Sequence, residues 1–552
     1  MGIKKNYTQL KISLLTPFFM FKNIFTTILI IFFFGYQIYI KSCEMKCDIE
    51  KESKCSIEET SKDKSISHSS EKINVLLIIA DDLNCDLGAY GNLIVKTPNI
   101  DRLAERGVLF ENAHNQYPLC GPSRASFMTG MYTNQTKITR NNMNLRNSIP
   151  DVVTLGQSFR QQGYQSVRIG KMFHYDNPSA IGTSGNDDIY SWDQTVNPYG
   201  RDKIEEYKIN TLTPRKYGGT LSWLAADGTD EEQTDGIAAS EAIKKLDDFA
   251  KRGTPFFLAV GFFRPHTPFV APKKYFELYE REKIEIPESS RDYLSTLPEP
   301  AAKSIRAKKN QLNLEKERAQ EIKEAYYATI SFVDAQVGRI LDHLDSIGLN
   351  KNTVVVFTSD HGYHMGEHGH WQKQTLFENA TQIPLIISAP NSENIGATSM
   401  SPVELIDLYP TLMDLTNIST PKHVVGKSLE PLMKNVNASV RGSALTRWRN
   451  GYSIKTKRYR LTKWGNNGEL GYELYDHKND KNELINLASN QDYNELMDYL
   501  KLVIEQRITD ASIKPESLGR QFENANPMYK AKNITYGDIH DKNGEILYLK
   551  KK

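Results

Sequence analysis

The most regular feature of the sequence is a series of short apolar runs with helical patterns between them. Residues 73–80 (INVLLIIA) are continuously apolar over the length of a strand, which is typical of a parallel strand buried on both faces of a sheet. Further runs follow the same rule later in the chain, at residues 166–169, 255–263, 353–358 and 384–390. The pattern therefore predicts a set of buried strands in one sheet.

Helical patterns separate these runs. Thr97-Pro98 opens a short helix that Gly107 closes, since proline is favoured just inside a helix start and glycine just past its end. Further helices are expected over residues 152–162 and 322–349, and the highly charged residues 280–323 are expected to form a surface insertion. Strands that alternate with helices predict an α/β fold with a large, mostly parallel sheet flanked by helices.

The pattern changes near residue 443. Residues 451–464 alternate between polar and apolar side chains, a short strand is expected at 472–475, and a helix is expected near 493–508. Short antiparallel strands covered by one helix make a smaller C-terminal α+β subdomain. This part of the chain is therefore expected to pack as an annex to the main sheet.

The N-terminus carries a targeting pattern. Four lysines precede an apolar run of 17 residues, 24–40, and the first acidic residue is Glu44. This arrangement is typical of a signal peptide or a signal anchor, and the run is at the short edge of what spans a bilayer. We expect an exported protein (secreted, periplasmic or lysosomal) that contacts a membrane only through this segment, if it is not cleaved. The predicted segments are a signal peptide or anchor (1–42), a polar leader (43–72), a catalytic domain (73–440) and the C-terminal subdomain (441–552).

Composition excludes some classes of protein. The formal net charge is +2 with 25% charged residues, so the global charge balance does not predict a nucleic-acid partner. A hydrophobic content of 39% is enough for a sizeable core and argues against disorder. All five cysteines lie within the first 120 residues, so the rest of the fold cannot depend on a disulfide framework.

Charged and imidazole side chains follow four of the predicted strands. Ligands of open α/β sheets bind beyond the carboxyl ends of the strands. Each pair alone has a simple structural explanation, as a turn, a helix cap or a hydrogen-bonded histidine. Their coincidence at four strand ends predicts a functional site instead. The residues are Asp81 and Asp82, Lys171 and His174, Arg264 and His266, and Asp360 and His361.

The acidic members of this set predict a metal ion. Asp81, Asp82 and Asp360 cannot share a few ångströms as bare anions, because like charges that close drive protonation. A divalent cation resolves the conflict, and mostly oxygen ligands favour Ca²⁺ or Mg²⁺ over zinc. The histidine-rich residues 361–370 lack the His-Glu-x-x-His spacing of a zinc protease.

A candidate nucleophile lies elsewhere, in Cys120-Gly121-Pro122-Ser123-Arg124. Pro122 suits the first turn of a helix, which places Cys120 at a helix N-terminus, where backbone N–H groups favour an anion. A thiolate there would be a nucleophile with a lowered pKa. The alternative is an inert buried cysteine, the usual state of an isolated one.

This pentapeptide, followed by Thr129-Gly130, resembles the signature of the sulfatases, a family of the alkaline-phosphatase-like superfamily. Residues 163–174 resemble the second sulfatase signature, and residues 257–269 and 358–373 are particularly similar to iduronate-2-sulfatases. The likeness covers about residues 73–490. The chain departs from the family pattern at Met131, where sulfatases usually have arginine, and at Arg264, where lysine is expected.

The resemblance implies a modified residue and a metal site. Cys120 would be oxidised to formylglycine by a formylglycine-generating maturation enzyme. The metal would be Ca²⁺, with Mg²⁺ as the alternative. Its expected ligands are Asp81, Asp82, Asp360, His361 and the modified Cys120.

The resemblance also implies catalytic roles. Arg124 and Lys171 would hold the hydrated formylglycine, and His174 would serve it as a base. His266 and Lys373 would bind the sulfate and assist the leaving oxygen. The chain would thus be a sulfuric ester hydrolase acting on a sulfated carbohydrate.

The implied substrate is the 2-O-sulfate of a uronic acid in a glycosaminoglycan-like chain, which makes glycosaminoglycan degradation the expected role. Arg264 is a candidate for gripping the uronate carboxylate, and Tyr363 for contacting the sugar ring. Alternatively, Arg264 pairs with a nearby acid and Tyr363 packs in the core.

Other functions stay open at this point. One is a sulfatase of another sulfated sugar or of a small ester. Another is a formylglycine-dependent phosphonate or phosphate ester hydrolase of the same superfamily. A secreted glycan-binding pseudoenzyme would be expected to have lost Asp81, Cys120, His174 or Asp360, and all four are present.

Overall fold

The computed structural model of the 552-residue chain describes residues 72–288, 291–312, 314–390 and 392–523. The expected signal segment, residues 1–42, lies outside the described residues, as does all of the expected leader except residue 72. None of the helices in the described part of the chain has the length and apolar character needed to cross a membrane.

The main sheet has eight strands in the order β14-β2-β13-β10-β1-β8-β4-β5. At its centre, β1 (Asn74–Asp81) pairs in parallel with β10 (Thr353–Ser359) on one side and with β8 (Phe256–Pro265) on the other. β4 (Gln165–Gly170) continues the parallel arrangement beside β8, and β5 (Gln194–Val196) ends it. Every residue of β1, β8 and β10 is buried, which confirms the fold class predicted from the continuous apolar runs.

The other end of the sheet corrects one expectation. β13 (Leu385–Ser388) runs antiparallel to β10 and to β2 (Val108–Phe110), while β14 (Ala397–Ser399) is parallel to β2. The run at 384–390 is a strand, as expected, but it is not a parallel one. An apolar run indicates that both faces of a strand are buried. Burial does not reveal whether the strand runs parallel or antiparallel to its neighbours.

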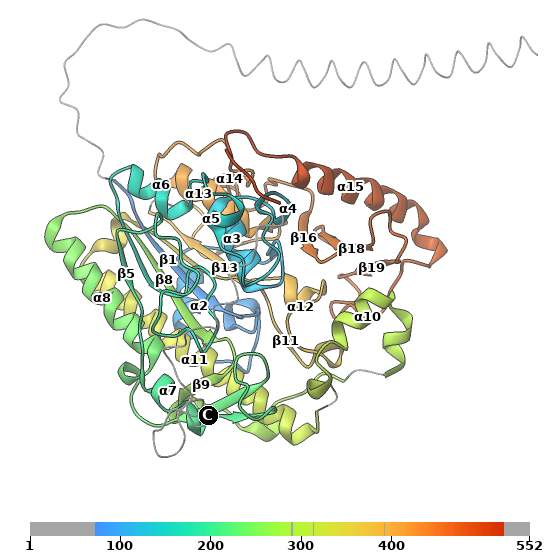
Figure 1. The fold of residues 1–552 in the computed structure, drawn as a ribbon, viewed down its shortest axis with the longest axis horizontal. Helices are drawn as coiled ribbons and strands as arrows, with labels where there is room; N and C mark the ends of the chain where they lie inside the picture. Colours follow the sequence, from blue (N-terminus) through green and yellow to red (C-terminus); the bar gives the residue numbers. More distant parts are fainter. Residues whose placement is uncertain (1–71, 289–290, 313, 391, 524–552) are drawn as a thin grey trace, which may run out of the picture. The chain divides into compact units, whose positions relative to one another are not determined.

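Helices cover both faces of this sheet (Figure 1). On one face, α2 (Pro98–Glu105), α8 (Thr234–Arg252) and α11 (Lys316–Ser346) pack against Leu76, Ile78 and the other even-numbered side chains of β1. Successive side chains of a strand point to opposite faces, so the odd-numbered residues of β1 belong to the second core.

That second core joins the opposite face to another group of helices. α3 (Cys120–Thr129), α6 (Leu155–Gln161) and α13 (Leu408–Leu415) contribute buried side chains that pack with Val75, Leu77 and Ile79. The expected helices at 97–107, 152–162 and 322–349 correspond to α2, α6 and α11, with small differences at the ends, where sequence patterns are least decisive.

The C-terminal part forms a second sheet, which is antiparallel, as expected. Its strands are β16 (Ala444–Trp448), β17 (Gly451–Lys455), β18 (Tyr459–Trp464) and β19 (Tyr472–Asp476), in that order. The helix α15 (Asn494–Ser512) packs Met497, Leu500 and Ile504 against apolar side chains of all four strands.

The charged segment 280–323 contributes buried side chains as well as surface. It contains α10 (Glu299–Ile305), whose Ala301 and Ile305 are buried against Trp448 and Trp464 of the C-terminal sheet. This packing fixes the position of the residues that follow α10, which reach the candidate active site.

Candidate active site

The carboxyl ends of four adjacent strands meet at one edge of the main sheet. β10, β1, β8 and β4 are neighbours in that order, and they are followed by Asp360, by Asp82, by His266 and by Lys171 respectively. All four side chains are buried. The structure therefore brings together the residues that the strand-end pattern selected, apart from Arg264.

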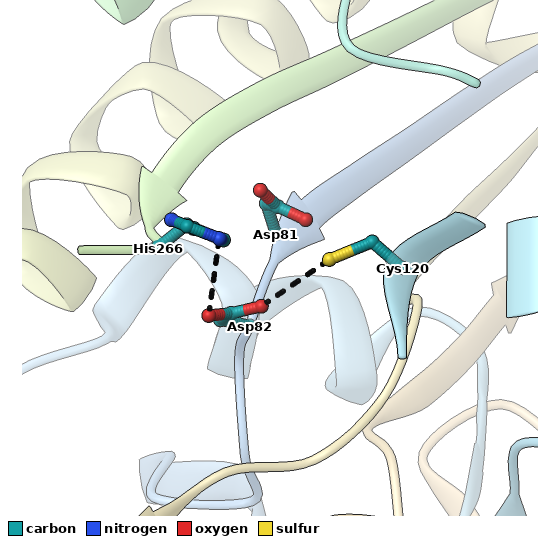
Figure 2. Close-up of side chains that lie close together, drawn as sticks. All are labelled: Asp81, Asp82, Cys120 and His266. Carbon is teal, nitrogen blue, oxygen red and sulfur yellow. Dashed lines mark hydrogen bonds and ion pairs between the residues drawn. The ribbon is translucent and has the colours of Figure 1, made fainter. Parts of the chain in front are cut away.

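Cys120 enters this site from the first residue of α3. Its side chain is fully buried, and its Sγ lies 3.3 Å from His361 Nε2, 3.2 Å from Lys373 Nζ and 3.8 Å from Asp82 Oδ1. Figure 2 shows Cys120 pointing from α3 toward Asp82. Burial alone would raise the pKa of the Cys120 thiol, but the positive charges of Lys373, Lys171 and His361 lower it well below its usual value. The surroundings of position 120 thus favour a negatively charged group.

Asp81 is held between two cations. Arg124 donates from Nη2 to Asp81 Oδ1 at 3.0 Å and from Nε to Asp360 Oδ2 at 2.9 Å, and Lys171 forms an ion pair with Asp81. Burial would raise the pKa of Asp81, but Lys171, together with His266 and Arg124, lowers it below its usual value. Arg124 is itself fixed by hydrogen bonds to the carbonyl oxygens of Lys171 and Met172, at 2.7 and 3.2 Å.

Asp82 has a strained backbone and an incompletely satisfied side chain. Its φ is 64°, in the left-handed region that non-glycine residues rarely adopt. Oδ1 contacts Lys373 and lies 3.3 Å from His361 Nε2. Oδ2 is buried without a hydrogen-bond partner and lies 3.7 Å from His266 Nε2. A buried carboxylate oxygen in this state indicates a missing electropositive partner.

The arrangement fits a divalent metal ion. Ligand atoms of Asp81, Asp82, Cys120 and His266 lie within 4.8 Å of one another, and so do those of Cys120, Asp360 and His361. Burial raises the pKa of Asp360 to about 6 in spite of the Arg124 charge. All five expected ligands belong to these two groups, and their carboxylate oxygens suit a hard cation.

Lys373 reaches the site from a two-stranded hairpin, β11 (His364–Met365) and β12 (Trp371–Gln372). Its neighbours Gln372 and Gln374 have φ values of 83° and 75°, so the backbone is bent on both sides of the lysine. Burial would lower the pKa of Lys373, but the negative charges of Asp82 and Cys120 raise it. The ammonium is therefore a fixed positive charge beside Cys120.

Two histidines stand at the border between this cluster and solvent. His174 places Nε2 3.1 Å from Asp176 Oδ1, while its Nδ1 is buried without a hydrogen-bond partner. Burial would lower the pKa of His174, but Asp176 and the nearby Cys120 raise it. His266 has Nδ1 2.5 Å from the carbonyl oxygen of Thr267. If Nδ1–H donates this bond, Nε2 is left facing Asp82.

A polar cavity of about 430 Å³ opens beside these groups. His174, His266 and Lys373 line it, together with Leu119, the residue before Cys120. A volume in this range suits a sugar-sized ligand.

The family comparison decides what this site belongs to. The family model described as Sulfatase matches residues 73–418, well over half of the chain. The chain belongs to the sulfatase family. A second model, described as N-sulphoglucosamine sulphohydrolase, C-terminal, matches residues 366–510 and so includes the antiparallel sheet.

Individual relatives agree with this assignment. A sulfatase of Formosa agariphila is 34% identical over 473 residues, which is 83% of this chain and 91% of the relative. The human (Homo sapiens) iduronate 2-sulfatase is 35% identical over 393 residues, 64% of this chain and 70% of the relative. A solved structure described as a 2-O GAG sulfatase is 25% identical, with a TM-score of 0.63 and coverage of 81% and 95% of the two chains.

The family implies a formylglycine and a divalent metal ion. The buried cluster of this sulfatase is consistent with both, because Cys120 lies at the start of α3 with three carboxylates around it. The chain is a hydrolase of sulfuric esters, and two of the similar proteins are described as an iduronate 2-sulfatase and a 2-O GAG sulfatase.

Two expected substrate contacts are wrong. Arg264 is buried, pairs with Asp202 at 2.7 Å and donates to the Val270 carbonyl oxygen, and it does not line the cavity. Tyr363 is fully buried in the core, where its ring stacks on Tyr326 at 5.6 Å. In both cases the structural alternative holds. A position near a strand end does not decide whether a long side chain turns toward the cavity or toward the protein interior.

Some cavity residues had no signal in the sequence. Lys308 and Arg215 line the cavity from two loops, and Glu206 lines it from a short helix. Lys308 lies among many other charged residues of the segment 280–323, so no pattern separates it from its solvent-exposed neighbours.

Proposed function

We propose that this sulfatase removes the 2-O-sulfate of uronic acid residues in glycosaminoglycan-like chains, with Ca²⁺ as its metal and Mg²⁺ as the alternative. The observation that carries the proposal is the 35% identity with human iduronate 2-sulfatase over 393 residues. That likeness is accompanied by a sugar-sized cavity beside Cys120.

The modified residue and the metal supply the core chemistry. Formylglycine at position 120 supplies a hydrated aldehyde as the nucleophile toward sulfur, and the bound divalent ion acts as a Lewis acid on the sulfate. The chain's own residues provide the setting. Arg124 and Lys171 are buried fixed charges next to Asp81 and Asp360, so they can stabilise negative charge without reorganising.

Proton transfer falls to residues at the border of the cavity. His174 lies near enough to position 120 for Cys120 to raise its pKa, and Asp176 holds its Nε2, so it is placed to hold a proton that comes from that group. His266 and Lys373 both line the cavity and face Asp82. Either can hold the proton that the departing alcohol oxygen needs.

The choice of metal follows from the ligand chemistry. Asp81, Asp82 and Asp360 offer carboxylate oxygens, which hard cations prefer. Ca²⁺ tolerates irregular coordination better than Mg²⁺, which demands near-octahedral geometry. A site made from two strand ends and a helix start is therefore better suited to Ca²⁺.

A substrate panel tests the proposal. Matured enzyme is assayed at equal concentrations of a 2-O-sulfated uronate disaccharide, 6-O-sulfated glucosamine, choline sulfate, nitrophenyl sulfate and a phosphonate monoester. We expect kcat/KM to be highest on the uronate. A preference for the amino sugar or for choline would overturn the substrate, and a preference for the phosphonate would overturn the assignment to sulfate esters.

Export of the protein is a separate proposal. It is supported by the basic N-terminal segment followed by the apolar run 24–40. Fusing residues 1–72 to a reporter that is active only outside the cytoplasm should give an active reporter. A silent reporter with a detectable fusion protein would contradict it.

A further inference from the structure

Two cations of the cavity have no partner of opposite charge. Lys308 and Arg215 line the same hollow as His174, His266 and Lys373. Other cavity residues are paired, His174 with Asp176 and Lys373 with Asp82, but no ion pair among the described residues includes Lys308 or Arg215. Unpaired positive charges in a concave, low-dielectric surface concentrate anions.

Hydrogen bonds join the two segments that carry these cations. Lys308 Nζ donates to the Gly219 carbonyl oxygen at 2.8 Å. Asn310 Nδ2 donates to Thr213 Oγ1 at 2.8 Å and to Thr220 Oγ1 at 3.1 Å. These bonds join the segment after α10 to the loop 212–220, which carries Arg215 between β6 (Asn210–Thr211) and β7 (Ser222–Ala226).

The loop 212–220 also packs closely against Asn177, which lines the cavity. A Cβ at Gly218 would lie 1.6 Å from the Asn177 carbonyl oxygen, so only glycine allows this approach. Arg215 itself has a φ of 63°, a left-handed conformation that costs free energy for a residue with a side chain. The surrounding contacts thus keep Arg215 at the cavity in an unfavourable backbone conformation.

The electrostatics of Lys308 agree with a role in anion binding. The ammonium is half-buried, and burial together with the Lys373 charge lowers its pKa. A positive charge that is desolvated next to another positive charge is destabilised until an anion arrives.

The same cavity contains a buried acceptor. Glu206 is 1% exposed; one carboxylate oxygen pairs with Lys203, and the other has no hydrogen-bond partner. Burial raises the pKa of Glu206 to about 7. Cationic groups near one free carboxyl oxygen match a ligand that carries a negative group and hydroxyl groups, as a sugar acid does.

We propose that Lys308 and Arg215 form the subsite for a second anionic group of the substrate, the carboxylate of its uronic acid, while His266 and Lys373 receive the sulfate. This inference rests on the proposed function and gives it the specificity contact that Arg264 does not provide. Arg264 cannot serve, because its guanidinium is buried and paired with Asp202.

Binding measurements on matched ligands test the subsite. The Cys120→Ala variant serves as the parent protein, because it cannot turn over the ligand. The two ligands are a 2-O-sulfated uronate disaccharide and its carboxyl-reduced counterpart, which keeps the sulfate. Calorimetric titration of Lys308→Met and Arg215→Met in this background should show Kd for the uronate raised roughly 10- to 100-fold, as expected for a lost charge-assisted hydrogen bond. Kd for the reduced ligand should stay unchanged.

The chain offers matched controls. Lys309 and Lys216 are exposed, as Arg215 is, and they adjoin the two cations without lining the cavity. Lys309→Met and Lys216→Met remove the same charge from nearly the same place, so they should leave both Kd values unchanged. Thermal melting checks that all variants remain folded.

The outcomes separate the subsite from the substrate. If Lys308→Met and Arg215→Met weaken both ligands equally, or neither, the subsite is overturned while the uronate substrate stands. If the parent protein already binds the reduced ligand as tightly as the uronate, the proposed substrate is overturned and the subsite with it.

Discussion

Two groups of carboxylates and histidines in this sulfatase are alike in composition, but only in one does the chain itself supply the neutralising charge. One is the catalytic cluster of Asp81, Asp82, Cys120, Asp360 and His361. The other, which we call the C-terminal cluster, is Glu378, His477 and Glu483. The potential ligand atoms of the C-terminal cluster lie within 4.8 Å of one another. The same limit holds within each of the two sets that overlap at Cys120 in the catalytic cluster.

The C-terminal cluster is neutralised from within the chain. Arg460 contacts Glu378 and donates from Nε to Glu483 Oε1 at 2.6 Å, and His477 Nε2 lies 2.8 Å from the same carboxylate. In the described chain, no buried side-chain atom of Glu378, His477 or Glu483 lacks a hydrogen-bond partner. The cluster ties α12 (Glu378–Thr381) to the C-terminal sheet.

The catalytic cluster remains incompletely satisfied although more cations surround it. Asp82 keeps a buried oxygen without a hydrogen bond, and the pKa of Asp360 stays raised beside Arg124. Its lysine, Lys373, lines a cavity. A group of acids and histidines is therefore a metal site or a structural link according to whether the chain itself supplies the neutralising charge.

The largest expected effect is the loss of turnover when the catalytic cluster loses the Cys120 side chain. Cys120→Ala should lower turnover by about 10³-fold or more, because the covalent route runs through that side chain. Cys120→Ser should be nearly as inactive. Assays of nitrophenyl sulfate hydrolysis check this, with Cys85→Ala, the other described cysteine, as the control that keeps activity. Substantial turnover by Cys120→Ala would contradict the formylglycine route.

Metal removal should affect only the catalytic cluster. The purified protein should contain about one Ca²⁺ or Mg²⁺ per chain, and rigorous chelation should abolish activity and lower the melting temperature, because the bound ion stabilises the folded state by about 2.7 kcal/mol at one hundred times its Kd. Elemental analysis of Asp82→Asn and Glu378→Gln sharpens the comparison. The first variant should lose the ion and the second should keep it. Stoichiometric zinc, or full activity without metal, would refute the assignment.

Breaking the C-terminal cluster should cost stability and spare the chemistry. Arg460→Met leaves the buried Glu483 and the partly buried Glu378 without their cation, so the free energy of unfolding should fall by about 3–5 kcal/mol. Denaturant titration measures this loss. The kcat of the protein that remains folded should match that of the wild type, and a selective loss of kcat would show that this cluster takes part in catalysis.

The smallest expected effect concerns selectivity. Arg264→Met removes the buried partner of Asp202, so it should destabilise the protein but leave the ratio of kcat/KM on the uronate to kcat/KM on nitrophenyl sulfate unchanged. Kinetics on both substrates with one enzyme preparation give this ratio. A fall confined to the uronate would restore Arg264 as a substrate contact.

The sequence predicts the catalytic cluster well because its residues follow buried strands. Asp81, Asp360 and Lys171 come directly after or at the end of apolar runs that leave little doubt about strand position, and parallel strands bring their carboxyl ends to one edge. Cys120 at the start of α3 follows from Pro122. These inferences use only local patterns and the topology of an open sheet.

Other features depend on tertiary contacts that no local pattern records. The direction of β13 is invisible in an apolar run, and the turn of Arg264 toward Asp202 depends on a residue 62 positions away. Lys308 lines the cavity from the segment that follows α10, and α10 packs on the C-terminal sheet. Substrate specificity, which depends on such loops, is therefore the part of the function that the sequence predicts least.

The central claim is that Cys120 acts as a formylglycine, and one mass-spectrometric series tests it most directly. The protein is co-expressed with graded amounts of a formylglycine-generating enzyme, and the peptide containing residue 120 is analysed together with turnover of each preparation. We predict that the aldehyde form of residue 120 is present and that kcat rises in proportion to its fraction. Full activity in a preparation whose Cys120 is entirely unmodified thiol would contradict the account.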